Sequence, residues 1–243
     1  MAGIIQCTSF GQFGNALFQY CHARAFANRL GATLETSYWV GQRLFKDVDE
    51  RPPSCKLPRT MMDEAPPNSS GVDLYGYFQN EASLSLYSIK EAKEWLQFKP
   101  EWIEKFPRKH EHYIAIHQRH GDYVSRYLHQ FCVPKPESAM RLAKYICADF
   151  GDMPIVVVSE ENAEDYDDPE LSFLPDFFTL MQSDYLIRAN SSFSWWAATL
   201  GNGVTFCPMV GDMVGWQDVS YISGNSEPFL IYPHHGYLYL RPE

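Results

Sequence analysis

The chain has 243 residues, of which 45% are hydrophobic and 21% are charged, a composition typical of a soluble globular protein and not of a disordered one. Its formal net charge of −10 argues against nonspecific binding to nucleic acid or to an anionic membrane, because both need an excess of Lys and Arg. There is no apolar run long enough to span a bilayer and no recognisable signal peptide, so we expect a cytoplasmic protein without a membrane span.

The first residues have the pattern of a β-α-β unit. Residues 4–7 predict a short buried strand, and a glycine-containing turn follows at 9–15. Apolar positions then recur at helical spacing until Gly31 ends the helix. A second strand is expected at 32–36, and this order of elements is typical of parallel sheets.

A proline-rich stretch at 46–71 interrupts this pattern and predicts an irregular excursion. It contains a DxD sequence at 47–49, which can hold a divalent metal on a nucleotide-sugar. No apolar strand leads into it, so we interpret these residues as solvated charges and expect no metal site. A strand at 72–78 and an amphipathic helix at 82–98 complete the first half.

A linker is predicted at 99–109, where Pro100 and Pro107 stand, so we expect an N-terminal domain at 1–108 and a C-terminal domain at 109–243. The second half alternates predicted strands and helices. The strands are expected at 113–116, 155–159, 185–189 and 204–207, and the helices at 137–150 and 192–200. The sequence therefore predicts an α/β protein made of two halves with a cleft between them.

The stretch DFFTLMQSDYLIRANSSFSWWAATLG at 176–201 combines an acidic residue, a strand, a hydroxyl-rich turn and the start of a helix. Ser191 and Ser192 place hydroxyl and backbone N–H groups where that helix begins, which is an arrangement that binds anions such as phosphate. A capped helix that buries Trp195 and Trp196 would also explain this stretch.

The stretch HQRHGDY at 117–123 follows a predicted strand directly, and open α/β sheets bind ligands at that end of a strand. Arg119 could grip a phosphate with its planar guanidinium, or it could be a structural residue paired with Asp122. The same stretch contains the RHG sequence of histidine phosphatases, in which His120 would be the nucleophile. That enzyme class places the motif close to the N-terminus, unlike this chain.

The sequence FGQFGN at 10–15 also lies between a predicted strand and a helix, where glycines allow the backbone to approach a ligand. The alternative is a tight turn with Asn15 as the helix N-cap.

Four blocks together resemble the α-1,2-fucosyltransferase family in their order and spacing: FGQFGNALFQY at 10–20, GYFQNE at 76–81, HQRHGDYV at 117–124 and the stretch at 176–201. The resemblance spans most of the chain. It implies a GT-B-like α/β fold, in which two Rossmann-like domains face a cleft. It further implies that the C-terminal domain binds GDP-β-L-fucose as the donor, that the N-terminal domain faces an acceptor oligosaccharide, and that no cofactor or metal is needed.

The resemblance also implies roles for individual residues in binding the donor. Arg119 is similar to the family arginine that neutralises the pyrophosphate, and Ser191 and Ser192, with Phe193 beside them, match pyrophosphate-binding positions. Three further residues match positions near the rest of the donor: His117 against the nucleotide, Asp176 at the guanine edge, and Asn15 reaching the donor from the other domain.

The implied reaction is a single inverting displacement at the anomeric carbon of fucose, in which Arg119 stabilises the departing GDP. Asp122 is the nearest candidate for the general base, and Glu81 and His120 are alternatives. The family usually reads HxRRGDY, whereas this chain has His120 at the second arginine and Gln12 where arginine is frequent. Each change removes a positive charge near the pyrophosphate. Two alternatives therefore remain: a transferase that uses another GDP-sugar, and a pseudo-enzyme that only binds glycan.

Overall fold

The computed structural model describes residues 3–48, 51–61, 69–79, 81–119, 136–160, 166–189, 191–208 and 229–232. The chain divides into two compact α/β units, Met1–Glu104 and Lys105–Glu243. The boundary that we expect from the sequence, after residue 108, falls in the connection between α5 (Pro100–Lys105) and β5 (Ile114–Gln118).

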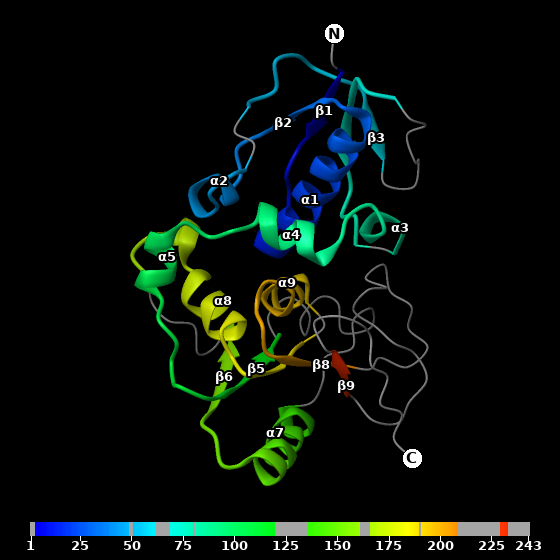
Figure 1. Cartoon of the computed structure of the whole chain (residues 1–243). Coiled ribbons are helices and arrows are strands. Elements are labelled where there is room, and N and C mark those ends of the chain that lie inside the picture. Colours follow the sequence, from blue (N-terminus) through cyan, green and yellow to red (C-terminus); the bar gives the residue numbers. More distant parts are fainter. Residues whose placement is uncertain are drawn as a thin grey trace. The chain divides into compact units, whose positions relative to one another are not determined.

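The N-terminal unit contains a four-stranded parallel sheet in the order β2-β1-β4-β3. Its strands are β1 (Ile4–Cys7), β2 (Thr33–Thr36), β3 (Arg59–Met61) and β4 (Val72–Tyr75). Helix α1 (Phe13–Leu30) connects β1 to β2, as the sequence predicts (Figure 1). It ends at Gly31, whose φ of 59° lies in the left-handed region that favours glycine.

Three details of this unit differ from the expectation. Helix α5 occupies most of the stretch 99–109 that the sequence predicts to be a linker. The stretch at 46–71 is not wholly irregular, because β3 lies within it and pairs with β4. The single helix expected at 82–98 is instead two helices, α3 (Glu81–Leu84) and α4 (Ile89–Trp95). Ser88 explains the third difference, since its hydroxyl accepts from the Glu91 N–H and the Glu91 carboxylate accepts from the Ser88 N–H. This capping box starts a new helix. The short helix α2 (Gly41–Leu44) completes the unit.

The C-terminal unit contains a five-stranded sheet in the order β6-β5-β7-β8-β9. The first four strands are parallel and β9 is antiparallel to β8. Besides β5, the strands are β6 (Ile155–Ser159), β7 (Tyr185–Ile187), β8 (Val204–Pro208) and β9 (Phe229–Tyr232). The helices are α7 (Pro136–Phe150), α8 (Leu174–Met181) and α9 (Ser192–Leu200), with a 3-10 turn at Pro169–Leu171.

Helices cover both faces of this sheet, with α7 on the opposite side from α8 and α9 (Figure 1). On the α7 side, Ala139, Ala143 and Ile146 pack against Ile114, Ile116, Ile187 and Phe206 of the strands. Helix α8 is absent from the sequence prediction. Because most of its residues are buried, it lacks the polar face that would distinguish an amphipathic helix from any other apolar run.

The described helices of both units are too short or too polar to cross a membrane. The fold class is the predicted one, an α/β protein with parallel sheets in both units.

Candidate functional site

The carboxyl ends of β5 and β6 lie side by side in the C-terminal sheet. The two strands pair in parallel with Gln118 opposite Ser159, so Arg119 and Glu160 follow at neighbouring positions. Their side chains form an ion pair between Arg119 Nη1 and Glu160 Oε1. The Arg119 side chain is only 16% exposed, against 44% for Glu160. The predicted phosphate ligand Arg119 is therefore held at the strand edge by a carboxylate from the next strand.

His117 lies on β5 two residues before Arg119 and is buried. Its ring packs against the ring of Phe193, with centroids 5.7 Å apart. Burial, together with the positive charges of Arg119 and Arg188, lowers the pKa of His117 to about 3, so this histidine is neutral at physiological pH. Its Nδ1 atom is buried and makes no hydrogen bond to any of the described residues.

The serine turn forms the N-terminus of α9. Ser191 is the N-cap, and its hydroxyl accepts a hydrogen bond of 3.3 Å from the Phe193 N–H. Ser192 is the first helical residue and is half-buried. Trp196 is fully buried and Trp195 is half-buried, so the interpretation as a capped helix that buries both tryptophans holds for the cap and for Trp196 only. The same turn also directs the positive end of the α9 dipole toward the carboxyl end of β7.

An aromatic cluster connects the start of α8 to the start of α9. The Phe193 ring makes edge-on contacts with Phe173 and Phe177, at centroid distances of 6.2 and 5.2 Å. Asp176 precedes Phe177 in the first turn of α8 and is half-buried. Through Phe193, the structure thus brings His117, the serine turn and the helix end that carries Asp176 into one neighbourhood.

Asn15 lies in the N-terminal unit, within the first turn of α1. It is not the N-cap, as one interpretation of the sequence had it, because Gln12 occupies that position. The Asn15 N–H donates to the Gln12 carbonyl, and its side-chain oxygen accepts a hydrogen bond of 2.7 Å from Gln79 Nε2. Gly11 precedes this turn with a φ of 79°, and a β-carbon there would lie 2.7 Å from Asn15 Nδ2. The glycine therefore leaves room for the Asn15 amide.

Arg188 belongs to this site, although the sequence analysis did not select it. It directly follows β7, and only 2% of it is exposed. Its backbone N–H donates to the Phe206 carbonyl, and its Nη1 donates to Cys207 Sγ at 3.2 Å. A charged residue inside the apolar run at 185–189, just before the serine turn, is the signal that could have identified it.

Several predicted residues fall elsewhere. Asp122 and His120, both candidates for the general base, lie outside the described residues, so the alternative pairing of Arg119 with Asp122 stays untested. Glu81 begins α3 in the N-terminal unit.

No protein-family model matches this chain, and no curated protein matches its sequence. Several solved structures match its fold. The α-1,6-fucosyltransferase NodZ soaked with GDP-fucose aligns over 96% of this chain and 99% of its own, with a TM-score of 0.58 and 15% sequence identity. A structure of NodZ from Bradyrhizobium aligns over 85% of this chain and 95% of its own, with a TM-score of 0.56 and 14% sequence identity. POFUT1 in complex with GDP aligns over 83% of this chain and 96% of its own, with a TM-score of 0.52 and 14% sequence identity.

The chain therefore has the α/β fold of GT-B fucosyltransferases. This similarity spans both of its units, but it is one of fold, at low sequence identity. The resemblance to the α-1,2-fucosyltransferase family stays a prediction from the four sequence blocks.

Proposed function

We propose that this protein is a glycosyltransferase that moves L-fucose from GDP-β-L-fucose to a hydroxyl group of an acceptor oligosaccharide, in α-1,2 linkage and with inversion. One observation carries the proposal. Arg119, His117 and the N-terminus of α9 converge at the carboxyl edge of a parallel sheet, where open α/β sheets bind ligands. The fold similarity to fucosyltransferases solved with GDP or GDP-fucose supports this choice of donor.

The pyrophosphate of the donor would lie between Arg119 and the start of α9. The planar guanidinium can bind two phosphate oxygens at once, and the first turn of a helix presents N–H groups without intrahelical acceptors. Ser192 begins that turn, and the Phe193 N–H next to it already donates to the Ser191 hydroxyl. Groups fixed in this way stabilise charge as it develops on a leaving group, and the loss of one typically raises the barrier by about 3 kcal/mol.

The nucleoside would extend toward the start of α8. Guanine presents two adjacent N–H donors, and the Asp176 carboxylate can accept both. His117, which is neutral and packs on Phe193, would hold the nucleotide by a hydrogen bond without adding charge. Asn15 would contribute to the donor site from the N-terminal unit, as the family resemblance implies.

Arg188 would replace part of the positive charge that the chain lacks at His120. It is buried next to the serine turn and acts electrostatically on His117, so its charge reaches the same neighbourhood. Charges in a buried environment are poorly screened and act over longer distances than exposed ones. Arg188 would thus raise the positive potential at the pyrophosphate without direct contact.

In the reaction, the acceptor oxygen forms a bond to the anomeric carbon while the bond from that carbon to the phosphate oxygen breaks. The proton of the acceptor hydroxyl passes to a general base, for which Asp122 is the candidate, and GDP leaves with the bonding electron pair. Arg119 and the α9 terminus stabilise the charge of GDP, so this mechanism assigns no step to a metal or a cofactor.

The ion pair between Arg119 and Glu160 favours one alternative function. If Glu160 keeps Arg119 engaged, every GDP-sugar is bound weakly, because all of them carry the same pyrophosphate, and the protein is a glycan-binding pseudo-enzyme. The histidine phosphatase is disfavoured, because the RHG sequence follows the fifth strand of a fucosyltransferase-like fold and not the first.

Incubation of the purified protein with GDP-β-L-fucose and lactose tests the proposed function. We expect release of GDP and a fucosylated trisaccharide detectable by mass spectrometry, and at least a hundredfold loss of rate in Arg119→Ala. Turnover of GDP-mannose in place of GDP-fucose would show that the donor assignment is wrong.

A further inference from the structure

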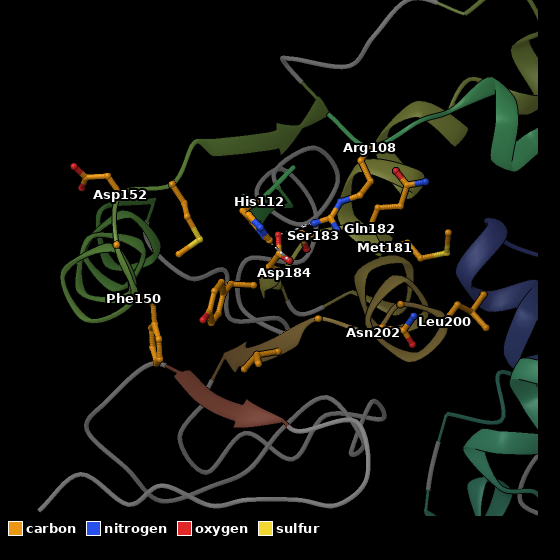
Figure 2. Close-up of a pocket in the computed structure, with 16 residues that line it drawn as sticks. Arg108, His112, Phe150, Asp152, Met181, Gln182, Ser183, Asp184, Leu200 and Asn202 are labelled. Carbon is orange, nitrogen blue, oxygen red and sulfur yellow. Dashed lines mark hydrogen bonds and ion pairs between the residues drawn. The ribbon is translucent and has the colours of Figure 1, made fainter. Parts of the chain in front are cut away.

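A cavity of about 790 Å³ opens beside the starts of β7 and β8 in the C-terminal sheet (Figure 2). Its walls include Asp184 and Tyr185 at the start of β7 and Val204 at the start of β8. Arg119 and His117 lie at the opposite, carboxyl end of β5. Five residues of strand span roughly 16 Å, so the two sites are separate. The volume is in the range of small-molecule binding sites.

Apart from His112, the charged residues that line the cavity are Arg108, Asp152 and Asp184, so the lining has no excess of positive charge. Asp184 accepts hydrogen bonds from Arg108 Nη2 at 2.6 Å and from the Tyr113 N–H at 2.9 Å, and it lies 3.4 Å from His112 Nδ1. Burial opposes ionisation of Asp184, but these hydrogen bonds and the Arg108 charge outweigh it and lower its pKa. The carboxylate is therefore ionised and already offsets the charge of Arg108, so the lining does not favour an anionic ligand.

Two aromatic rings form one wall. Phe150 ends α7, and its ring is 5.4 Å from that of Tyr185. Phe150 is 66% exposed, so much of its side chain is not covered by the rest of the protein. Gly151 turns the chain away directly after it, with a φ of 100°. The exposed ring face is thus available to a ligand.

Amide side chains line the cavity as well. Gln182 donates from Nε2 to the Phe106 carbonyl, but its buried Oε1 accepts no hydrogen bond from the described residues. Because this atom is buried, Gln182 shapes the wall of the cavity and its oxygen does not contact a ligand. Asn202 follows the C-terminal end of α9 and is exposed at the cavity (Figure 2).

We propose that this cavity binds a neutral oligosaccharide, as a second glycan site distinct from the transfer site. A pyranose ring has an apolar face of C–H groups that can stack on Phe150, while its hydroxyl groups can donate to Asp184 and can accept from Asn202. A nucleotide or phosphate would need an uncompensated positive charge, which the lining lacks. Binding here does not depend on the proposed transferase activity.

The test is a titration of the ¹⁵N-labelled protein with lacto-N-neotetraose, a neutral tetrasaccharide, followed by NMR at the backbone amides of Gly151, Gly201 and Gly203. We expect saturable shifts at these cavity glycines. Phe150→Ala should raise the Kd read from them at least fivefold, and Asn202→Ala should raise it as well. Tyr145→Ala is the matched control, because Tyr145 lies on the same helix, is 63% exposed and does not line the cavity, so its Kd should equal that of the wild type.

The proposal is overturned if the tetrasaccharide leaves these amides unmoved, or if Phe150→Ala binds as tightly as the wild type. It is equally overturned if inorganic phosphate or GDP shifts the same amides while the tetrasaccharide does not, since the cavity would then be an anion site.

Discussion

Arg119 and Glu160 directly follow two neighbouring parallel strands and form an ion pair at the edge of the C-terminal sheet. In the proposed function the pyrophosphate competes with this carboxylate for the same guanidinium. Glu160→Gln keeps an oxygen that can accept from Arg119 and removes the negative charge. We therefore expect Glu160→Gln to bind GDP severalfold more tightly than the wild type, measured by isothermal titration calorimetry.

The control is Glu137→Gln, which removes an exposed carboxylate from the first turn of α7 and should leave GDP binding unchanged. Weaker binding by Glu160→Gln would mean that the carboxylate orients Arg119 for the phosphate and does not compete with it.

Arg188 gives a second prediction. Arg188→Met replaces the buried guanidinium by a neutral side chain of similar length, which well-packed sites often tolerate. We expect a roughly tenfold weaker affinity for GDP, because the positive potential beside the serine turn is lost. Arg188→Lys keeps the charge and should recover most of the affinity. Equal GDP affinity of the Met variant and the wild type would show that Arg188 does not contribute to donor binding.

Ser191 and Ser192 should differ in what they contribute. Ser191→Ala removes the N-cap hydrogen bond of α9 and should lower the free energy of unfolding by about 1 kcal/mol in urea denaturation. Ser192→Ala leaves that cap intact, so it should weaken GDP binding several-fold while the unfolding midpoint stays within error. A loss of stability in Ser192→Ala, together with weaker GDP binding only in Ser191→Ala, would contradict the assignment of Ser191 as the helix cap and Ser192 as the GDP ligand.

Two buried histidines make stability depend on pH. Burial lowers the pKa of His22 from 6.5 to about 4, against an opposing hydrogen bond with the Ser83 backbone, and the pKa of His117 falls to about 3. Below pH 6.5 the unfolded chain binds protons that the folded chain excludes, so the free energy of unfolding falls as the pH falls toward these values. Each histidine contributes up to about 1.4 kcal/mol per pH unit.

Urea denaturation between pH 7 and pH 5 measures this slope above the range in which most carboxyl groups titrate. His22→Gln should reduce the change in the free energy of unfolding per pH unit, because only His117 of the two buried histidines then contributes to it. Parallel curves for His22→Gln and the wild type would show that His22 titrates normally in the folded protein.

Much of the fold could be predicted from the sequence because strands such as β1, β6 and β7 are short, mainly apolar runs, and because Gly31 and the serine turn mark helix ends. The local exceptions have physical causes. Ser88 and Glu91 together start a helix that apolar periodicity alone does not reveal. Strand β3 forms within a proline-rich stretch because it pairs with β4, a contact between residues distant in sequence.

The site was harder to predict than the fold. Sequence reasoning identified Arg119 and the serine turn from their places after strands, but the partner Glu160 depends on the register of β5 against β6, which a single sequence does not contain. Arg188 was missed because a charged residue in an apolar run carries no motif. The cavity of Figure 2 joins α7, α9 and the starts of two strands, so only the folded chain brings its lining together.

The central claim is that the donor binds at the carboxyl edge of the C-terminal sheet, and an NMR titration of the ¹⁵N-labelled wild-type protein with GDP-β-L-fucose tests it most directly. We expect saturable shifts at the backbone amides of His117, Ser192 and Phe193, and their loss in Arg119→Ala. Shifts confined to other parts of the chain, or the same shifts with full affinity in Arg119→Ala, would contradict this account.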